Sequence, residues 1–212
     1  MLTLYDYLPS QNAWKIRLLL SHLERPYNQN MVSIFEGEGQ HASFLAKNPT
    51  GAVPVLQLDD GTTVAESNAI LVYLATGTQY FPSSIHRQAH VLQWLFFESD
   101  YVQSSVATLR HWVLTGKAKN RSEELLTSKY EASVKALTVL NGRLSDNAFL
   151  TGQEYTIADM SVYAYVHLSE DAGISLADFS CVQRWIELVR KQPGFLSDIF
   201  PYSIDEYSFR EL

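Results

Sequence analysis

The sequence predicts an α/β domain followed by an all-helical domain. Strand-like and helical patterns alternate over the first 77 residues, whereas the remaining residues show helical periodicity only. Between the two parts, residues 77–85 break the pattern and are rich in glycine, proline and serine, which is typical of a linker. We therefore expect two domains, at residues 1–77 and 86–212, joined by a linker at residues 77–85.

The first half of the α/β domain has the pattern of a strand, a helix and a second strand. Residues 2–6 alternate in polarity, and residues 12–24 carry apolar side chains at helical spacing until Pro26 stops the helix. Residues 30–34 have the pattern of the second strand. A unit of this length predicts a parallel strand pair joined by a right-handed crossover.

The second half of this domain adds a short helix, a hairpin and a final helix. Asp60-Gly61 is the turn expected between the two strands of the hairpin. The resulting order, βαβ-ββα, is thioredoxin-like. The four segments are expected at residues 41–46, 55–58, 63–65 and 66–75.

Helical periodicity dominates after the linker. Thr156 and Asp159 have the spacing of a capping box, in which the hydroxyl caps the helix start and the acid caps back. We expect this motif to be structural and its helix to be buried. The helices of the second domain are expected at about residues 86–115, 122–145, 156–171 and 178–191.

Composition narrows the function classes. The chain has 212 residues, of which 46% are hydrophobic and 18% charged, and its formal net charge is -7. Without a basic block, this charge argues against nucleic acid or an anionic membrane as main partner. Cys181 is the only cysteine, so a reducing compartment fits. With no leader-like start and no apolar run of membrane length, we expect a soluble, cytoplasmic protein.

The sequence does not favour metal or dithiol chemistry. His86 and His90 have the spacing of two metal ligands on one helix face, but no carboxylate beside them suggests a third ligand. No Cys-x-x-Cys motif is present, which excludes dithiol chemistry of the glutaredoxin type. We therefore expect no metal, and we expect Cys181 to be inert.

Two short segments predict a binding site for a small zwitterionic peptide. Val53-Pro54 stands where a strand begins, and a proline there leaves the neighbouring backbone free to pair with another molecule. If that peptide bond is cis, Val53 is turned toward a peptide-like ligand. Glu66 and Ser67 stand where the next helix begins, and a helix start offers free N–H groups and a positive dipole end to a carboxylate. On spacing alone, these two residues are more often ordinary helix-start residues than a ligand site, because acids favour helix starts.

Three stretches together resemble the cytosolic glutathione S-transferase family of bacterial type, over about the whole chain. The resemblance implies a glutathione-binding domain, a helical domain, a cis Val53-Pro54 bond and a homodimer. The stretches are Leu4 to Arg17, then Asn48 to Leu56 followed by Glu66 to Ile70, and lastly Thr156 to Ser161.

The resemblance also assigns roles around glutathione, the implied co-substrate. The Val53 backbone, held by Pro54, would pair with the cysteinyl group. Glu66 would meet the α-ammonium and Ser67 the γ-glutamyl carboxylate. Relatives often carry Lys or His opposite the glycyl carboxylate, whereas this chain has Gln40, which implies a neutral hydrogen bond and weaker binding unless His41 compensates.

The group that stabilises the glutathione thiolate is expected at the start of the first helix. Ser10 is the first candidate and Asn12 the second, because the stretch is similar to the serine-type and Thr/Asn-type members of the family. Tyr7 and Tyr5 are competing donors. Both Ser10 and Asn12 are also good helix caps, so a purely structural role stays open.

The resemblance implies conjugation of glutathione to a small hydrophobic electrophile bound between the domains. The candidate contacts are Tyr101, Arg110 and Trp112, although aromatic residues on a long helix are more often core. The same thiolate could instead act on disulfides or hydroperoxides. A third alternative is a binding module without catalysis, against which the joint presence of Ser10, Pro54, Glu66 and Ser67 argues.

Overall fold

The computed structural model describes residues 1–207. The chain divides into two compact units, one formed by Met1–Ala75 with Pro193–Leu212 and the other by Thr76–Gln192. The sequence prediction placed all of residues 86–212 in one helical domain, whereas the residues from Pro193 onward group with the α/β unit. Contacts with the first helix explain this difference, because the Phe195 ring lies 6.0 Å from the Trp14 ring.

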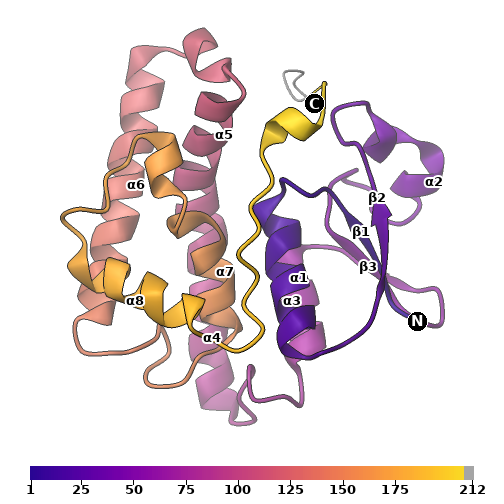
Figure 1. The fold of residues 1–212 in the computed structure, drawn as a ribbon, viewed down its shortest axis with the longest axis horizontal. Coiled ribbons are helices and arrows are strands. Elements are labelled where there is room, and N and C mark those ends of the chain that lie inside the picture. Colours follow the sequence, from indigo (N-terminus) through magenta and orange to yellow (C-terminus); the bar gives the residue numbers. More distant parts are fainter. Residues whose placement is uncertain (208–212) are drawn as a thin grey trace. The chain divides into compact units, whose positions relative to one another are not determined.

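The α/β unit contains a four-stranded mixed sheet with the order β2-β1-β3-β4 (Figure 1). β1 and β2 are parallel, and Thr3 is paired with Asn28. β3 is antiparallel to both β1 and β4. The strands span Thr3–Asp6 (β1), Asn28–Met31 (β2), Val55–Gln57 (β3) and Thr63–Val64 (β4). The predicted βαβ-ββα order is therefore confirmed.

The helices of this unit flank the sheet. α1 (Gln11–His22) and α3 (Ser67–Ala75) lie on one face, and α2 (Ala42–Leu45) lies on the other (Figure 1). The segment before α2 contains a 3₁₀ helix at Glu38–Gln40, and the C-terminal residues form another at Tyr202–Ile204. Fully buried aliphatic side chains fill the space between the sheet and the two helices, among them Leu4, Ile16, Leu19, Leu56 and Ile70.

Thr76–Gln192 form a helical unit. α4 (Ile85–Phe97) continues through a π-helix at Glu98–Ala107 into α5 (Thr108–Leu114), which matches the long helix predicted from residue 86. The remaining α-helices are α6 (Glu123–Leu144), α7 (Ile157–Val166) and α8 (Ser180–Arg190), with 3₁₀ turns at Lys117–Asn120 and Ser169–Ala172. Among the described residues, no helix is long and apolar enough to cross a membrane.

The predicted capping box at the start of α7 is confirmed. Thr156 Oγ1 accepts from the Ala158 N–H at 3.3 Å, and Asp159 Oδ2 accepts from the Thr156 N–H at 3.0 Å. Asp159 Oδ1 also accepts from the Leu150 N–H at 2.9 Å and from the Trp185 Nε1–H at 3.0 Å. The carboxyl is completely buried, and this burial raises its pKa to about 6 against the opposing effect of its hydrogen bonds. The motif thus joins α7 to α8 as well as capping a helix.

Candidate active site

The turn between β1 and α1 is fixed by a buried ion pair. Arg17 donates from one guanidinium nitrogen to both carboxylate oxygens of Asp6, at 2.6 and 2.7 Å, and from another to the Leu8 carbonyl at 2.9 Å. Both side chains are buried, at 7% and 0% exposure. Because a buried pair breaks only at high cost, this contact holds the residues that lead into α1.

Ser10 is the N-cap of α1. Its N–H donates to the Tyr7 carbonyl at 2.8 Å, and its Oγ accepts from the Ala13 N–H at 3.3 Å. Ser10 therefore has the structural role of a helix cap. This role does not exclude donation to a thiolate, because a capping hydroxyl accepts with a lone pair and keeps its hydrogen to donate.

Asn12 lies within the first turn of α1, two residues after the cap, and joins this helix to α3. Its Oδ1 accepts a hydrogen bond from Ser67 Oγ at 3.3 Å. One turn further on, Lys15 Nζ donates to Asn68 Oδ1 at 3.0 Å. Asn12 is partly exposed, whereas Lys15 and Ser67 are buried. Two of the predicted site residues, from separate motifs, are thus brought into contact.

Glu66 precedes α3 in a left-handed backbone conformation. Its φ is +65°, and its carbonyl accepts the first hydrogen bond of the helix, from the Ile70 N–H. This conformation costs about 1–2 kcal/mol for a residue with a side chain, and such strain concentrates at ligand sites. The Glu66 side chain is exposed, so its carboxylate is accessible to a ligand at the helix start.

The Val53–Pro54 peptide bond is cis, as predicted. Asn48 shapes the loop before it, because its Nδ2 donates to the Ala52 carbonyl at 2.8 Å and its Oδ1 accepts from the Thr50 N–H at 3.2 Å. Within residues 1–207, the backbone N–H and C=O of Val53 have no hydrogen-bond partner. This agrees with the unpaired backbone expected beside Pro54, and pairing of Val53 with a peptide-like ligand stays a prediction.

Two glycines bring Gln40 close to this loop. A Cβ atom at Gly39 would lie 2.2 Å from the Gly51 carbonyl oxygen, and one at Gly51 would lie 2.4 Å from Gln40 Nε2. Gly51 also has a φ of +70°. Only glycine permits this close approach, so both positions place Gln40 against the loop that ends at Pro54. Gln40 and His41 are exposed.

The competing tyrosines occupy different environments. Tyr5 donates from its hydroxyl to Gln57 Oε1 at 3.0 Å, so it is engaged in the sheet. Tyr7 is buried against Phe35, with ring centroids 5.6 Å apart. Its pKa is raised well above the usual value, chiefly because of burial and secondly because of the nearby Asp205 carboxylate. Tyr7 therefore stays protonated, and its hydroxyl faces a pocket described below.

The three predicted electrophile contacts lie in the helical unit. Arg110 is buried and donates from Nε to Asp171 Oδ2 at 2.9 Å, which makes it a structural ion pair. Trp112 is half-buried beneath the Arg121 guanidinium, 4.8 Å from the ring centroid. Tyr101 is 53% exposed and stacks on Phe97. Their role in binding an electrophile stays a prediction, for which the exposed Tyr101 ring is the best placed.

His86 and His90 meet on α4, with their Nε2 atoms 3.2 Å apart. Across the described part of the chain, no group of three or more His, Cys, Asp or Glu residues is arranged to hold a metal ion. Cys181 is the second residue of α8, and its N–H donates to Asn141 Oδ1 at 3.0 Å.

Sequence reasoning missed Lys15 and Asn68. Lys15 lies about one turn after Asn12, and Asn68 directly follows Ser67. The hydrogen bond between Lys15 and Asn68 is therefore a second link between α1 and α3, beside the one between Asn12 and Ser67. The available signal was a lysine on the apolar side of a helix, which is unusual unless the charge has a partner.

Comparisons with known proteins agree with this arrangement. Residues 1–76 match the family described as glutathione S-transferase, N-terminal domain, and residues 105–193 match the corresponding C-terminal domain. A crystal structure of a glutathione S-transferase from Pseudomonas fluorescens Pf-5 is 37% identical, with a TM-score of 0.89, and the match covers 92% of this chain and 97% of that one.

Two proteins of Escherichia coli K12 are also similar over most of their length. Glutathione S-transferase GstB is 28% identical over 204 residues, covering 92% of this chain and 95% of its own. Disulfide-bond oxidoreductase YfcG is 30% identical over 202 residues, covering 92% of both chains. The relatives thus carry two different activities on one fold.

Proposed function

Because the chain belongs to the glutathione S-transferase family, we propose that it activates glutathione as the thiolate and conjugates it to small hydrophobic electrophiles. The observation that carries this proposal is the hydrogen bond between Asn12 and Ser67, which brings together the starts of α1 and α3. Each helix start presents free N–H groups and a positive dipole end to an anion. The two ends can therefore serve the two anionic parts of glutathione, its thiolate and its γ-glutamyl carboxylate.

Binding would follow the length of the tripeptide. The unpaired Val53 backbone pairs with the cysteinyl backbone, as an added strand would. Ser67 and the α3 N–H groups hold the γ-glutamyl carboxylate, and the exposed Glu66 carboxylate meets the α-ammonium. Gln40, packed over Gly51, donates to the glycyl carboxylate.

Activation would require only a modest stabilisation of the thiolate. A free cysteine thiol has a pKa of about 8.5, and lowering it by two units corresponds to about 2.7 kcal/mol. The Ser10 hydroxyl, the Asn12 amide and the α1 dipole can supply this amount. The thiol proton leaves to solvent, the sulfur forms a bond to the electrophilic atom, and the electron pair of the broken bond departs with the leaving group.

A second candidate activity is glutathione-dependent reduction of disulfides. It is favoured by Asn12, which suits the Thr/Asn type, and by the similarity to YfcG. Here the same thiolate attacks a disulfide sulfur and expels the other sulfur as a thiolate. A second glutathione then attacks the mixed disulfide, which gives oxidised glutathione and a reduced product. No cysteine of this chain is needed for either step.

One panel of substrates separates these activities. Wild-type protein and the Asn12→Ala variant are assayed with glutathione and 1-chloro-2,4-dinitrobenzene, cumene hydroperoxide or hydroxyethyl disulfide. Conjugation that falls at least tenfold in the variant supports the transferase. Reduction of the disulfide or peroxide without conjugation would contradict the transferase activity and support the reductase activity. No turnover of any substrate would refute both activities.

A further inference from the structure

The C-terminal segment, residues 193–207, lies along the α/β unit. It starts at the end of α1, where the Pro193 carbonyl accepts from His22 Nδ1 at 2.6 Å and the Gly194 carbonyl accepts from Ser21 Oγ at 2.8 Å. It ends beside the loop that follows β2, where Asp205 Oδ2 accepts from Ser33 Oγ at 2.8 Å. The segment therefore forms one wall of a pocket, and the α/β unit forms the other.

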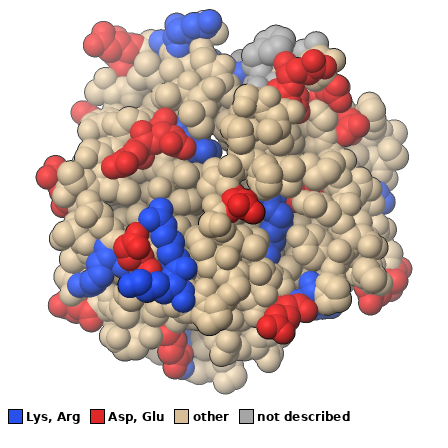
Figure 2. All heavy atoms as spheres, viewed as in Figure 1, with Lys and Arg blue, Asp and Glu red and all other residues tan. Residues whose placement is uncertain are grey.

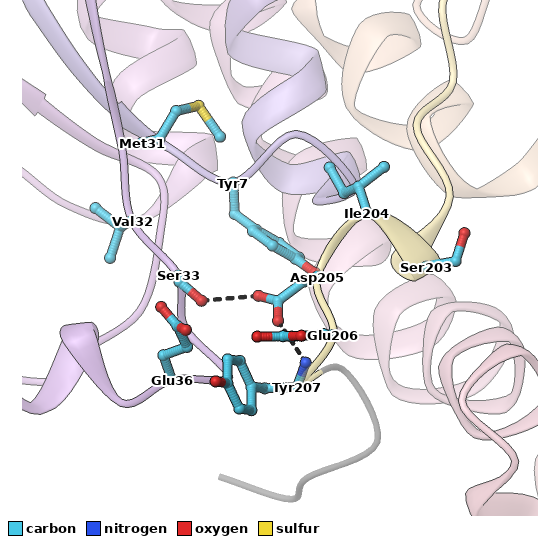
Figure 3. Close-up of a pocket in the computed structure, with 10 residues that line it drawn as sticks. All are labelled: Tyr7, Met31, Val32, Ser33, Glu36, Ser203, Ile204, Asp205, Glu206 and Tyr207. Atoms are coloured by element: carbon cyan, nitrogen blue, oxygen red, sulfur yellow. Dashed lines mark hydrogen bonds between the residues drawn. The ribbon is translucent and has the colours of Figure 1, made fainter.

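This pocket has a volume of about 470 Å³, which suits a small organic molecule (Figure 3). Apolar side chains from both walls line part of it, namely Met31, Val32 and Ile204. The polar part consists of Ser33, Tyr7 and three carboxylates, from Glu36, Asp205 and Glu206. We call this cavity the tail pocket.

The tail pocket is strongly acidic. Among the described residues 1–207, no Lys or Arg lines the pocket, and none of its three carboxylates is ion-paired with a Lys or Arg of that range. Asp205 is held in place, because its oxygens accept from Ser33 Oγ and from the Tyr207 N–H, both at 2.8 Å. In the space-filling view, acidic side chains gather at the upper right, where the C-terminal segment ends (Figure 2).

Tyr7 supplies a second, independent observation. Its side chain is only 3% exposed, and its hydroxyl has no hydrogen-bond partner among residues 1–207. The ring points into the tail pocket toward Asp205 (Figure 3). A buried hydroxyl without a partner costs about 1–3 kcal/mol, so an unfilled hydrogen bond here calls for a ligand.

We propose that the tail pocket binds a small organic cation, an ammonium or guanidinium group carried on an apolar body. The carboxylates of Glu36, Asp205 and Glu206 attract the charge, and the Tyr7 oxygen accepts one of its hydrogen bonds. Met31, Val32 and Ile204 contact the apolar body. Glutathione, with two carboxylates and one ammonium, is disfavoured here. The proposal is therefore independent of the activity proposed above.

The test is calorimetric titration of the full chain without glutathione, using phenethylamine and agmatine as cations and 2-phenylethanol as the neutral match for phenethylamine. At least one amine should bind with one-to-one stoichiometry, and the alcohol should bind at least tenfold more weakly than phenethylamine. The Glu36→Gln/Glu206→Gln double variant should lose at least tenfold in amine affinity. Both side chains are exposed, so this variant should fold.

Two further variants sharpen the assignment. Tyr7→Phe should weaken amine binding severalfold while its circular dichroism stays that of the wild type. Glu131→Gln, on an exposed face of α6 outside the pocket, should bind like the wild type. Absence of binding for both amines, equal binding of phenethylamine and the alcohol, or unchanged affinity in the double variant would overturn the proposal.

Discussion

Ser67 donates a hydrogen bond to the side-chain oxygen of Asn12 across 55 positions of sequence. Oδ1 of Asn12 is the acceptor of this bond. An amide nitrogen can donate to a thiolate, whereas a carboxylate in the same place would repel one. The contact places the residue proposed for carboxylate recognition, at the start of α3, beside a residue proposed for sulfur stabilisation, in the first turn of α1.

The Ser67→Ala variant should bind glutathione more weakly, by about 1–3 kcal/mol, because the γ-glutamyl carboxylate loses a buried hydroxyl donor. Calorimetry at pH 7 measures the change. Ser84→Ala is the matched control, since Ser84 precedes α4 and makes no capping hydrogen bond with its side chain. Equal dissociation constants for Ser67→Ala and the wild type would limit Ser67 to a structural role.

The effects of Ser67→Ala and Asn12→Ala on glutathione affinity should not add. Each substitution removes the same hydrogen bond of the free protein, so the double variant should lose less than the sum by at least about 0.5 kcal/mol. A double-mutant cycle by calorimetry gives this coupling. Strict additivity would show that the Asn12–Ser67 contact does not orient either group for glutathione.

The thiol of bound glutathione should titrate about one pKa unit higher in Ser10→Ala or Asn12→Ala than in the wild type, or about 1.4 kcal/mol. The cause is the loss of a donor to the thiolate at the start of α1. Ultraviolet absorbance of the thiolate reports the titration. Tyr5→Phe should leave it unchanged, because the Tyr5 hydroxyl is bonded to Gln57. An increase in Tyr7→Phe alone would make Tyr7 the donor.

Hydrophobic periodicity predicted most elements, but it placed β2 two residues late. The prediction placed the strand at residues 30–34, whereas the strand is formed by Asn28–Met31. All four residues of this edge strand are exposed, so only backbone pairing with β1 places them in the sheet. Their side chains therefore lack the alternation of apolar and polar residues that would indicate a strand. The C-terminal segment was missed for a related reason, because its attachment to α1 depends on backbone carbonyls.

Residues of the candidate site could be predicted where a residue type at a strand or helix start has a known effect on the local backbone. Pro54 at a strand start and Glu66-Ser67 at a helix start are such cases. The Asn12–Ser67 and Lys15–Asn68 contacts depend on how α1 packs beside α3, which no local pattern encodes. Likewise, Arg110 was proposed as a ligand contact, but its burial beside Asp171 arises from tertiary packing.

The Asp159→Ala variant should be destabilised by about 4 kcal/mol or more. It removes the cap of α7 and leaves the buried Trp185 Nε1–H and Leu150 N–H without an acceptor. Urea denaturation at pH 7.5 measures the free energy of unfolding. Asp146→Ala, at an exposed position, should change it by less than about 0.5 kcal/mol. A loss below about 1 kcal/mol for Asp159→Ala would contradict this role.

His167 should make the folded chain less stable as the pH falls. Its ring stacks on Tyr163 at 4.2 Å, and its Nδ1–H donates to the Tyr163 carbonyl at 2.6 Å. Burial lowers the pKa of His167 to about 4, whereas the unfolded chain protonates it near 6.5. Its contribution to stability is therefore complete above pH 6.5 and is lost progressively down to about pH 4.

Asp159 acts in the opposite direction over an overlapping range. Because burial raises its pKa to about 6, the folded chain binds its proton before the unfolded chain does. Its contribution to stability therefore increases as the pH falls from about 6 to about 4. The net acid response of the wild type is a difference between the two groups, and a variant of one group is needed to separate them.

The His167→Gln variant should therefore lose less stability than the wild type between pH 7 and pH 5, by about 2 kcal/mol. Urea denaturation at both pH values gives the two losses, and the comparison cancels the Asp159 contribution because both proteins retain it. His41→Gln, at an exposed position, is the matched control and should follow the wild type. If His167→Gln and the wild type lost equal free energy over this range, His167 would not be kept neutral by burial in the folded chain.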